Sequence, residues 1–86
     1  MALPRGPQGM IAIMDISSPT VLWRLWNPAG EYARAVIIPG DPQTTLTVFV
    51  NDVMDRAENF DGLDVALFRA DDLKISLLGD GWREEN

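Results

Sequence analysis

Arg24, Trp26, Tyr32 and Arg34 are the residues whose types and spacing could do chemistry. They lie within the stretch "RLWNPAGEYAR", at alternating positions on either side of a turn sequence. Two guanidinium groups beside aromatic rings can bind a carboxylate or a phosphate, with the rings as a platform. Two arginines that face each other on a sheet also repel, so neutralisation within the protein is the simpler alternative. The carboxylates available for it are those of Glu31, Asp71, Asp72, Glu84 and Glu85.

The turn "NPAG", residues 27–30, positions these four side chains. Proline suits the second position of a type I turn, and glycine suits the left-handed residue of a three-residue hairpin loop. This turn predicts a register with one mixed face and one wholly apolar face. The mixed face pairs Trp26 with Tyr32, Arg24 with Arg34, and Leu22 with Val36. The apolar face pairs Leu25 with Ala33, Trp23 with Ala35, and Val21 with Ile37.

Other catalytic and metal-binding chemistry has little support in this sequence. The chain has no histidine and no cysteine, which removes the commonest general base, thiolate sites and disulfides. It has no phosphate-binding glycine loop, and no histidine to activate a serine. Three acidic residues recur every third position, at Asp52, Asp55 and Glu58, as on a solvated helix face or a site for a cation or basic partner. We therefore expect no enzyme, no cofactor and no metal.

The net negative charge indicates which classes of partner the protein is suited to bind. Thirteen acidic residues against seven basic ones give a net charge of −6. An acidic surface disfavours nucleic acid and anionic membranes, and it tolerates basic protein partners. No apolar run approaches a membrane span of about 20 residues, and the start lacks the pattern of a signal peptide. We expect a cytoplasmic protein whose size and composition would suit a phage or mobile-element accessory protein.

The stretch "GDPQTTLTVFVND" gives two opposite predictions for the middle of the chain. Asp41-Pro42 resembles a helix start, and seven apolar residues of 46–60, all but Val48, fall within an arc of about 140° on a helix. Thr44 to Val50, however, has the composition of a strand. We predict one helix over 42–59. The alternative is a strand to Val50, followed by a short helix that Asn51 would cap.

The remaining segments complete the predicted architecture. Residues 1–9, rich in proline and glycine, predict a flexible arm, and 10–16 predict a first strand. "LDVALFRA" (63–70) is apolar on both faces and predicts an interior strand, and "LKISLL" (73–78) predicts the last strand. Asp61, Asp64, Asp71 and Asp72 suit turns. Residues 80–86 form a polar tail, in which Trp82 either folds back onto the domain or enters a partner's pocket.

The sequence therefore predicts one α+β domain over residues 10–79. It would contain a single antiparallel or mixed five-stranded sheet with one helix on one face, in the order β-β-β-α-β-β. The helix covers the wholly apolar face, so the opposite face stays uncovered, with Phe68 added to it. An uncovered apolar face of this kind typically marks a contact surface. We expect a non-enzymatic interaction module that forms a homodimer through this face; the alternative is an anion-binding domain. The predicted contact residues are Leu22, Arg24, Trp26, Tyr32, Arg34, Val36 and Trp82.

Overall fold

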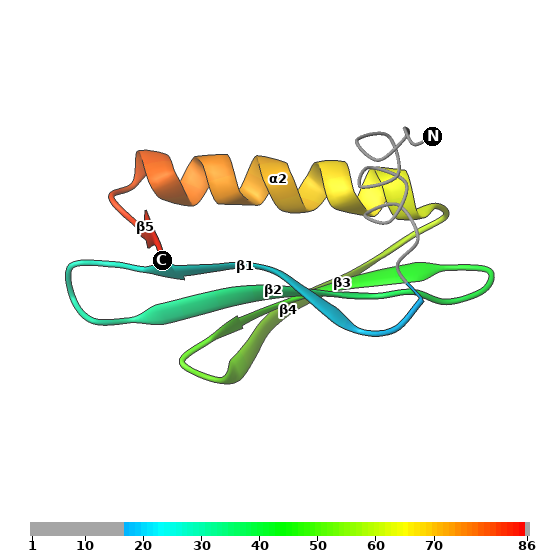
Figure 1. The fold of residues 1–86 in the computed structure, drawn as a ribbon, viewed down its shortest axis with the longest axis horizontal. Helices are drawn as coiled ribbons and strands as arrows, with labels where there is room; N and C mark the ends of the chain where they lie inside the picture. Colours follow the sequence, from blue (N-terminus) through cyan, green and yellow to red (C-terminus); the bar gives the residue numbers. More distant parts are fainter. Residues whose placement is uncertain (1–16, 86) are drawn as a thin grey trace, which may run out of the picture.

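The computed structural model describes residues 17–85 of the 86-residue chain. Five strands form one sheet in the spatial order β4-β3-β2-β1-β5, and every neighbouring pair is antiparallel. A single helix, α2, lies along one face of the sheet (Figure 1). The elements are β1 (Thr20–Trp26), β2 (Tyr32–Ile38), β3 (Thr44–Val50), β4 (Val53–Phe60), α2 (Leu63–Gly79) and β5 (Arg83–Glu84).

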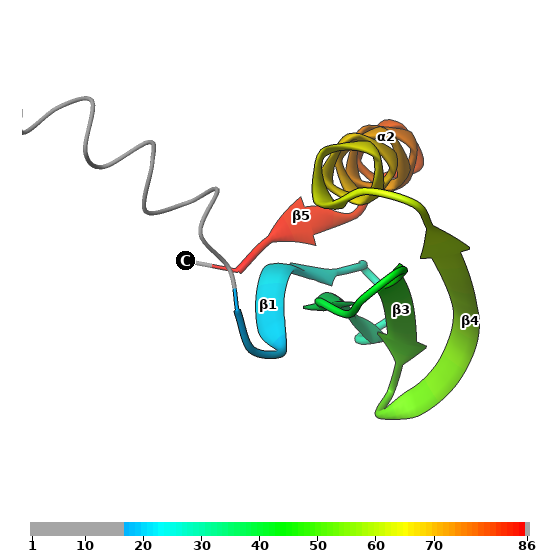
Figure 2. The ribbon, with the colours of Figure 1, turned by 90° about the vertical axis from the view of Figure 1, so that its right-hand side faces the viewer.

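The predicted fold class, an α+β sheet of five strands with one helix on one face, is confirmed. Viewed along the sheet, α2 lies entirely on one side of it (Figure 2). The predicted order is wrong, because the described elements run β-β-β-β-α-β. The strand predicted at 10–16 and the arm at 1–9 lie outside the described residues.

The hairpin of β1 and β2 has the predicted register next to its loop and a different one farther away. Trp26 lies opposite Tyr32, and Arg24 lies opposite Arg34. Beyond Trp23 the register shifts, so that Val21 lies opposite Val36 instead of Ile37. Leu22 is the extra residue of this bulge, and it packs against the core instead of facing Val36. A bulge inserts one residue into one strand only, and the turn chemistry of the loop carries no information about it.

The helix predicted over 42–59 is wrong: this segment forms the hairpin of β3 and β4. The alternative was right about the strand to Val50 but not about the short helix after it. Asn51 and Asp52 have φ angles of 53° and 66°. Two left-handed residues in a two-residue loop make the turn that matches the twist of a hairpin, and asparagine and aspartate tolerate it. The β-branched threonines and valines of residues 44–50 therefore follow their strand preference.

The strands predicted at 63–70 and 73–78 are also wrong, because both belong to α2. This helix carries apolar residues on two sides, which resembles the two-sided pattern of a buried strand. The residues that contact the core follow alternating spacings of three and four and are Leu63, Ala66, Ala70, Leu73 and Leu77. The N-cap residue Gly62 makes no side-chain cap, so the usual signal of a helix start is missing. Asp71 and Asp72 lie on the exposed side of the helix and form no turn.

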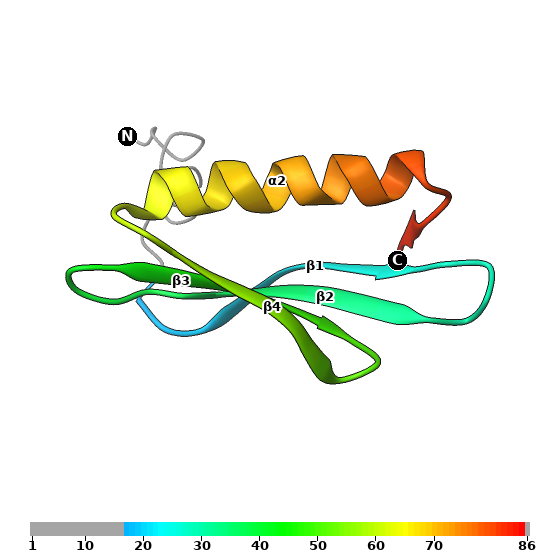
Figure 3. The same cartoon turned by 180° about the vertical axis from the view of Figure 1, so that it is seen from behind.

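The core lies between α2 and the sheet. Its buried residues are Trp23, Leu25, Ala33, Ala35, Ile37, Leu46, Val48, Ala66 and Ala70. The Trp23 Nε1 donates a buried hydrogen bond of 2.9 Å to the carbonyl oxygen of Ala70, which joins the sheet to the helix. Seen from behind, the helix runs from the end of β4 across to β5 beside β1 (Figure 3). This helix therefore covers one face of the sheet, and no other element of residues 17–85 covers the opposite face.

Residues 80–85, within the predicted polar tail, are packed onto the domain. The backbone N–H of Trp82 donates to the carbonyl oxygen of Leu77, and Gly81 adopts a φ of 100°, as in a glycine-terminated helix end. The Trp82 ring then packs against the core, so the folded-back alternative describes it. Arg83 and Glu84 pair with the end of β1, and Glu84 forms an ion pair with Lys74.

Candidate functional site

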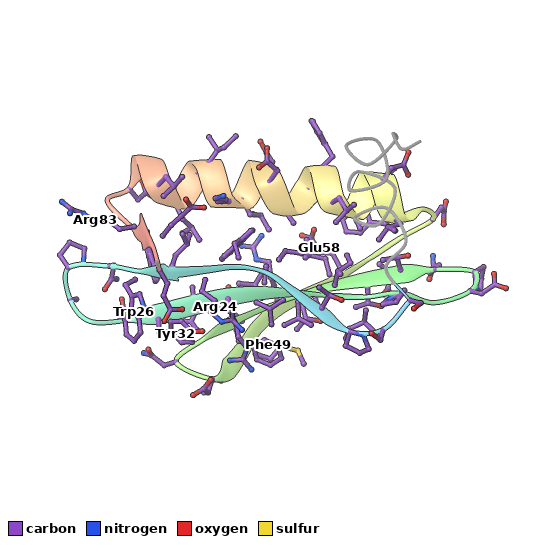
Figure 4. The ribbon with its side chains drawn as sticks, viewed as in Figure 1. Arg24, Trp26, Tyr32, Phe49, Glu58 and Arg83 are labelled. Carbon is purple, nitrogen blue, oxygen red and sulfur yellow. The ribbon has the colours of Figure 1, made fainter. Side chains whose placement is uncertain are left out.

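The candidate site is the face of the sheet that points away from α2, which we call the open sheet face. Side chains alternate between the two faces of a strand, so the neighbours of the core residues in β1 to β4 point to this face. Figure 4 shows Arg24, Trp26, Tyr32 and Phe49 on this side, whereas Glu58 points toward the helix. We define the open sheet face by Arg24, Trp26, Tyr32, Arg34, Val36, Phe49 and Met54.

The loop between β1 and β2 fixes the position of Trp26 and Tyr32. Gly30 has a φ of 86°, which glycine adopts without strain. The Asn27 side chain accepts a hydrogen bond of 2.8 Å from the Glu31 backbone N–H and donates one of 2.7 Å to the Glu31 carboxylate. These bonds close the loop directly beside the aromatic pair. The Trp26 and Tyr32 ring centroids lie 4.6 Å apart at an interplanar angle of 35°.

Arg34 is held by partners that come from β3 and from the turn after it. Its guanidinium carbon lies 4.4 Å from the centroid of the Phe49 ring. Its Nη1 donates to the Asp52 carboxylate at 2.6 Å. The same turn is tied to β2 by Asn51, whose side-chain oxygen accepts a hydrogen bond of 3.0 Å from the Tyr32 backbone N–H. Arg34 is therefore neutralised and stacked within its own chain.

The repulsion between the two arginines is offset by two separate carboxylates. Arg24 Nε lies 3.9 Å from a Glu85 carboxylate oxygen, and the backbone N–H of Glu85 donates to the Arg24 carbonyl oxygen. Arg34 turns to Asp52 instead. Glu85 was among the expected partners, whereas Asp52 was not, because the predicted helix placed it on a different element. The open sheet face therefore carries both signs of charge in close pairs.

The apolar part of the open sheet face is accessible. Trp26 is 42% exposed and Met54 is 59% exposed, and Val36 and Phe49 are half-buried. Thr47, at the centre of the same face, is buried, so the middle of the face is filled by side chains. An apolar surface of this kind, bordered by paired charges, can exclude water against a matching surface.

Three predictions about site residues need correction. Leu22 packs against the core because of the bulge, so it is not part of the open sheet face. Phe68, predicted on the same sheet face, lies on α2 and is 75% exposed. Asp55 and Glu58, predicted on a solvated helix face, lie on β4, where Glu58 accepts a hydrogen bond of 3.1 Å from Arg69 Nε. This bond and the charge of Glu58 raise the pKa of the Arg69 guanidinium above its ordinary value.

Phe49, Met54 and Asp52 are the site residues that sequence reasoning missed. Their signal was the alternation of 44–50 followed by a two-residue turn, which places Phe49 opposite Met54 on the same face as Arg34. This signal was outweighed because the apolar residues of the same segment also fit one side of a helix. Val36 is the predicted contact residue that keeps its place at the side of this group, whereas Trp82 lies on the helix side of the sheet.

Two hollows of the described structure lie beside the sheet and the helix. One, of 530 Å³, lies along the edge of β1 and is lined by Leu22, Trp23, Arg24, Glu84 and Glu85. A smaller cavity of 160 Å³ opens under the end of α2, beside Trp82. Among residues 17–85, no group of three or more acidic side chains is arranged to hold a metal ion.

Comparisons with protein-family models, with curated proteins and with solved structures gave no match to this chain. The helix found within residues 17–85 is not long and apolar enough to cross a membrane. The function therefore has to be argued from the surfaces of the molecule itself.

Proposed function

We propose that this protein is a non-enzymatic interaction module that forms a homodimer through the open sheet face. The observation that carries the proposal is the group of Trp26, Tyr32, Phe49 and Met54 on the side opposite the helix, which no element of residues 17–85 covers. Tryptophan, tyrosine and arginine are the residue types that contribute most to protein interfaces. A face that presents them without a cover has the composition of a contact surface.

The charges of this face favour a second copy as the partner. Arg34 is paired with Asp52, and Arg24 lies beside Glu85. When the faces of two copies meet, no unpaired arginine of one copy has to approach the same arginine of the other. The remaining contact is between aromatic and aliphatic side chains, which gain free energy when they leave water. A two-fold dimer also needs only one self-complementary patch, and this face provides one.

The size of the face sets the expected strength of the dimer. Four strands of about seven residues, at about 3.3 Å per residue and about 4.8 Å between strands, give a projected area of about 440 Å². Stable interfaces bury about 800 Å² on each partner. Side-chain relief adds to the projected area, but the interface remains at the small end of the range. We therefore expect a dissociation constant in the micromolar range.

Sedimentation velocity over a concentration series tests this proposal. The wild-type chain should pass from monomer to dimer between about 1 and 100 μM. Trp26→Glu should raise the Kd by about 100-fold or more, because each dimer contains two copies of this exposed aromatic residue. The circular dichroism of the variant should match the wild type, because Trp26 is not part of the core.

The matched control is Phe68→Glu, which places the same charge at an exposed aromatic position on the far side of the molecule. It should leave the dimer unchanged. A wild-type chain that stays monomeric at 100 μM would overturn the dimer. If Phe68→Glu dissociated the dimer and Trp26→Glu did not, the dimer contact would lie on the helix and not on the open sheet face.

The alternative, an anion-binding domain, has less support. Arg24 and Arg34 do not point to a common position that an anion could occupy, because each already lies beside a carboxylate of the same chain. The net charge of −6 opposes anion binding as well. A thermal-shift screen with phosphates and dicarboxylates would revive this alternative if a stabilisation appeared in the wild type and disappeared in Arg24→Ala.

A further inference from the structure

The side of α2 that faces away from the sheet carries a second apolar surface, which we call the outer helix stripe. Its members are Val65, Phe68, Ile75 and Leu78, with exposed fractions of 51%, 75%, 61% and 39%. Successive members are three or seven residues apart, so they follow one side of the helix over a length of about 20 Å. Figure 4 shows side chains standing on this side of α2, where no described element covers them.

The fold of the chain does not need this stripe. The opposite side of α2 already supplies the contacts to the sheet, through Ala66, Ala70, Leu73 and Leu77. Single exposed apolar residues are ordinary on protein surfaces, but here four share one side of a helix, in two pairs separated by the turn that carries Asp71 and Asp72. Phe68 is the most exposed of the large apolar residues in the described structure. Such a stripe is suited to a partner that lies along the helix.

The charge around the stripe is of one sign. Asp71 and Asp72 each lie three or four residues from both Phe68 and Ile75, and Asp64 lies four residues before Phe68, so all three border the stripe. Both basic residues of the helix are engaged with carboxylates of the same chain. Arg69 binds Glu58 on β4 while also touching Asp72, and Lys74 pairs with Glu84 on β5. Asp72 is therefore partly balanced by Arg69, whereas Asp64 and Asp71 have no basic partner within ion-pair distance in the described structure, and the stripe keeps an acidic border.

We infer that the outer helix stripe docks a basic amphipathic helix of another protein. The apolar residues of that helix would pack on Phe68 and Ile75, and its lysines or arginines would meet Asp64, Asp71 and Asp72. A second copy of this chain is a poor occupant, because two such stripes would place aspartates against aspartates. The stripe lies on the opposite side of the molecule from the open sheet face, so both surfaces can be occupied at once. This inference does not depend on the dimer, and either can fail without the other.

Binding of synthetic peptides to the full chain tests the inference. The probe is a fluorescein-labelled peptide of about 16 residues with leucines at positions i, i+3, i+4 and i+7 and lysines elsewhere. A second peptide has glutamate in place of every lysine, and a third has the composition of the first in a scrambled order. Fluorescence anisotropy measures the Kd, and amide chemical shifts locate the contact.

The expected result is binding of the basic amphipathic peptide at least about tenfold tighter than either control peptide. The largest shifts should fall on residues 64–79. Phe68→Ala with Ile75→Ala should weaken the binding by about tenfold or more, and Asp71→Lys should weaken it while leaving the apolar residues in place. Trp26→Glu is the matched control on the far face, and it should bind the peptide as the wild type does.

Three outcomes would overturn the inference. If the scrambled peptide bound as tightly as the basic amphipathic peptide, the binding would be explained by nonspecific charge attraction alone. Shifts centred on the open sheet face, or loss of binding in Trp26→Glu, would place the peptide on the other surface. Self-association of the chain that is lost in Phe68→Ala would make a second copy the occupant. Because Phe68 and Ile75 are exposed, their alanine variants should fold normally, so a loss of binding can be attributed to the stripe.

Discussion

The open sheet face and the outer helix stripe are both apolar surfaces that no element of residues 17–85 covers, yet they differ in how their charges are arranged. On the sheet, Arg34 and Asp52 are paired at 2.6 Å, and Arg24 lies 3.9 Å from Glu85. On the helix, Asp64 and Asp71 border the stripe without a basic partner within ion-pair distance in the described structure. The apolar residues favour association at both surfaces. The charges favour a second copy at the open sheet face and a basic partner at the outer helix stripe.

The two surfaces also differ in how they are held. The open sheet face is built from four strands whose hydrogen bonds fix each side chain against its neighbours. The outer helix stripe depends on one helix, which is held by its inward residues and by the hydrogen bond from Trp23. Substitutions in the core should therefore weaken binding at both surfaces, whereas changes in charge or salt should affect binding at the two surfaces to different extents. The following predictions use that difference, from the largest expected effect to the smallest.

Replacing Trp23 should produce the largest change, because this residue supports both surfaces. Trp23→Ala should lower the free energy of unfolding by about 3–5 kcal/mol, since it empties a buried aromatic site. Trp23→Phe retains part of the ring volume, but it loses the hydrogen bond to Ala70 and leaves a smaller gap, so its cost should be lower. Urea denaturation followed by circular dichroism measures both. Near-equal stability of Trp23→Ala and the wild type would show that this residue does not join sheet and helix.

Salt should affect binding at the two surfaces to different extents. Raising NaCl from 50 to 500 mM shortens the range of exposed charges to a few ångströms. The basic peptide should then lose about tenfold or more in affinity for the outer helix stripe, whereas the dimer Kd should change by less than about threefold. Anisotropy and sedimentation at each salt concentration provide the two measurements. A dimer that dissociates as steeply as the peptide would remove the distinction between the surfaces.

Asp52→Asn should produce the smallest change and the most local one. Asparagine keeps the left-handed turn, but Arg34 then loses its ion pair. The Asp52 side chain is 77% exposed, so the monomer should change in stability by less than about 1 kcal/mol. The dimer should weaken several-fold, because two unpaired arginines then approach each other. Asp55→Asn, on β4, is the control and should leave the dimer Kd unchanged.

Part of the candidate site could be predicted because its geometry is set by local rules. The turn "NPAG" and the alternation around it place Trp26 opposite Tyr32 and Arg24 opposite Arg34, as the structure has them. Phe49 and Met54 could not be assigned with the same reasoning, since the apolar residues of 46–60 satisfy a helical period as well as a strand period. The stripe of Phe68 and Ile75 was concealed for a related reason: residues 63–78 are apolar on both sides.

The sequence by itself determined the hairpin next to its loop, the contrast between its two faces, and the absence of histidine and cysteine chemistry. Those properties depend on residue types and on contacts between neighbours in the chain. The tertiary structure alone decided that 44–60 is a hairpin, that 63–79 is one helix, and that Leu22 turns into the core. These choices depend on which apolar residues can be buried together. Each segment satisfies more than one local period, and only packing against the rest of the chain selects between them.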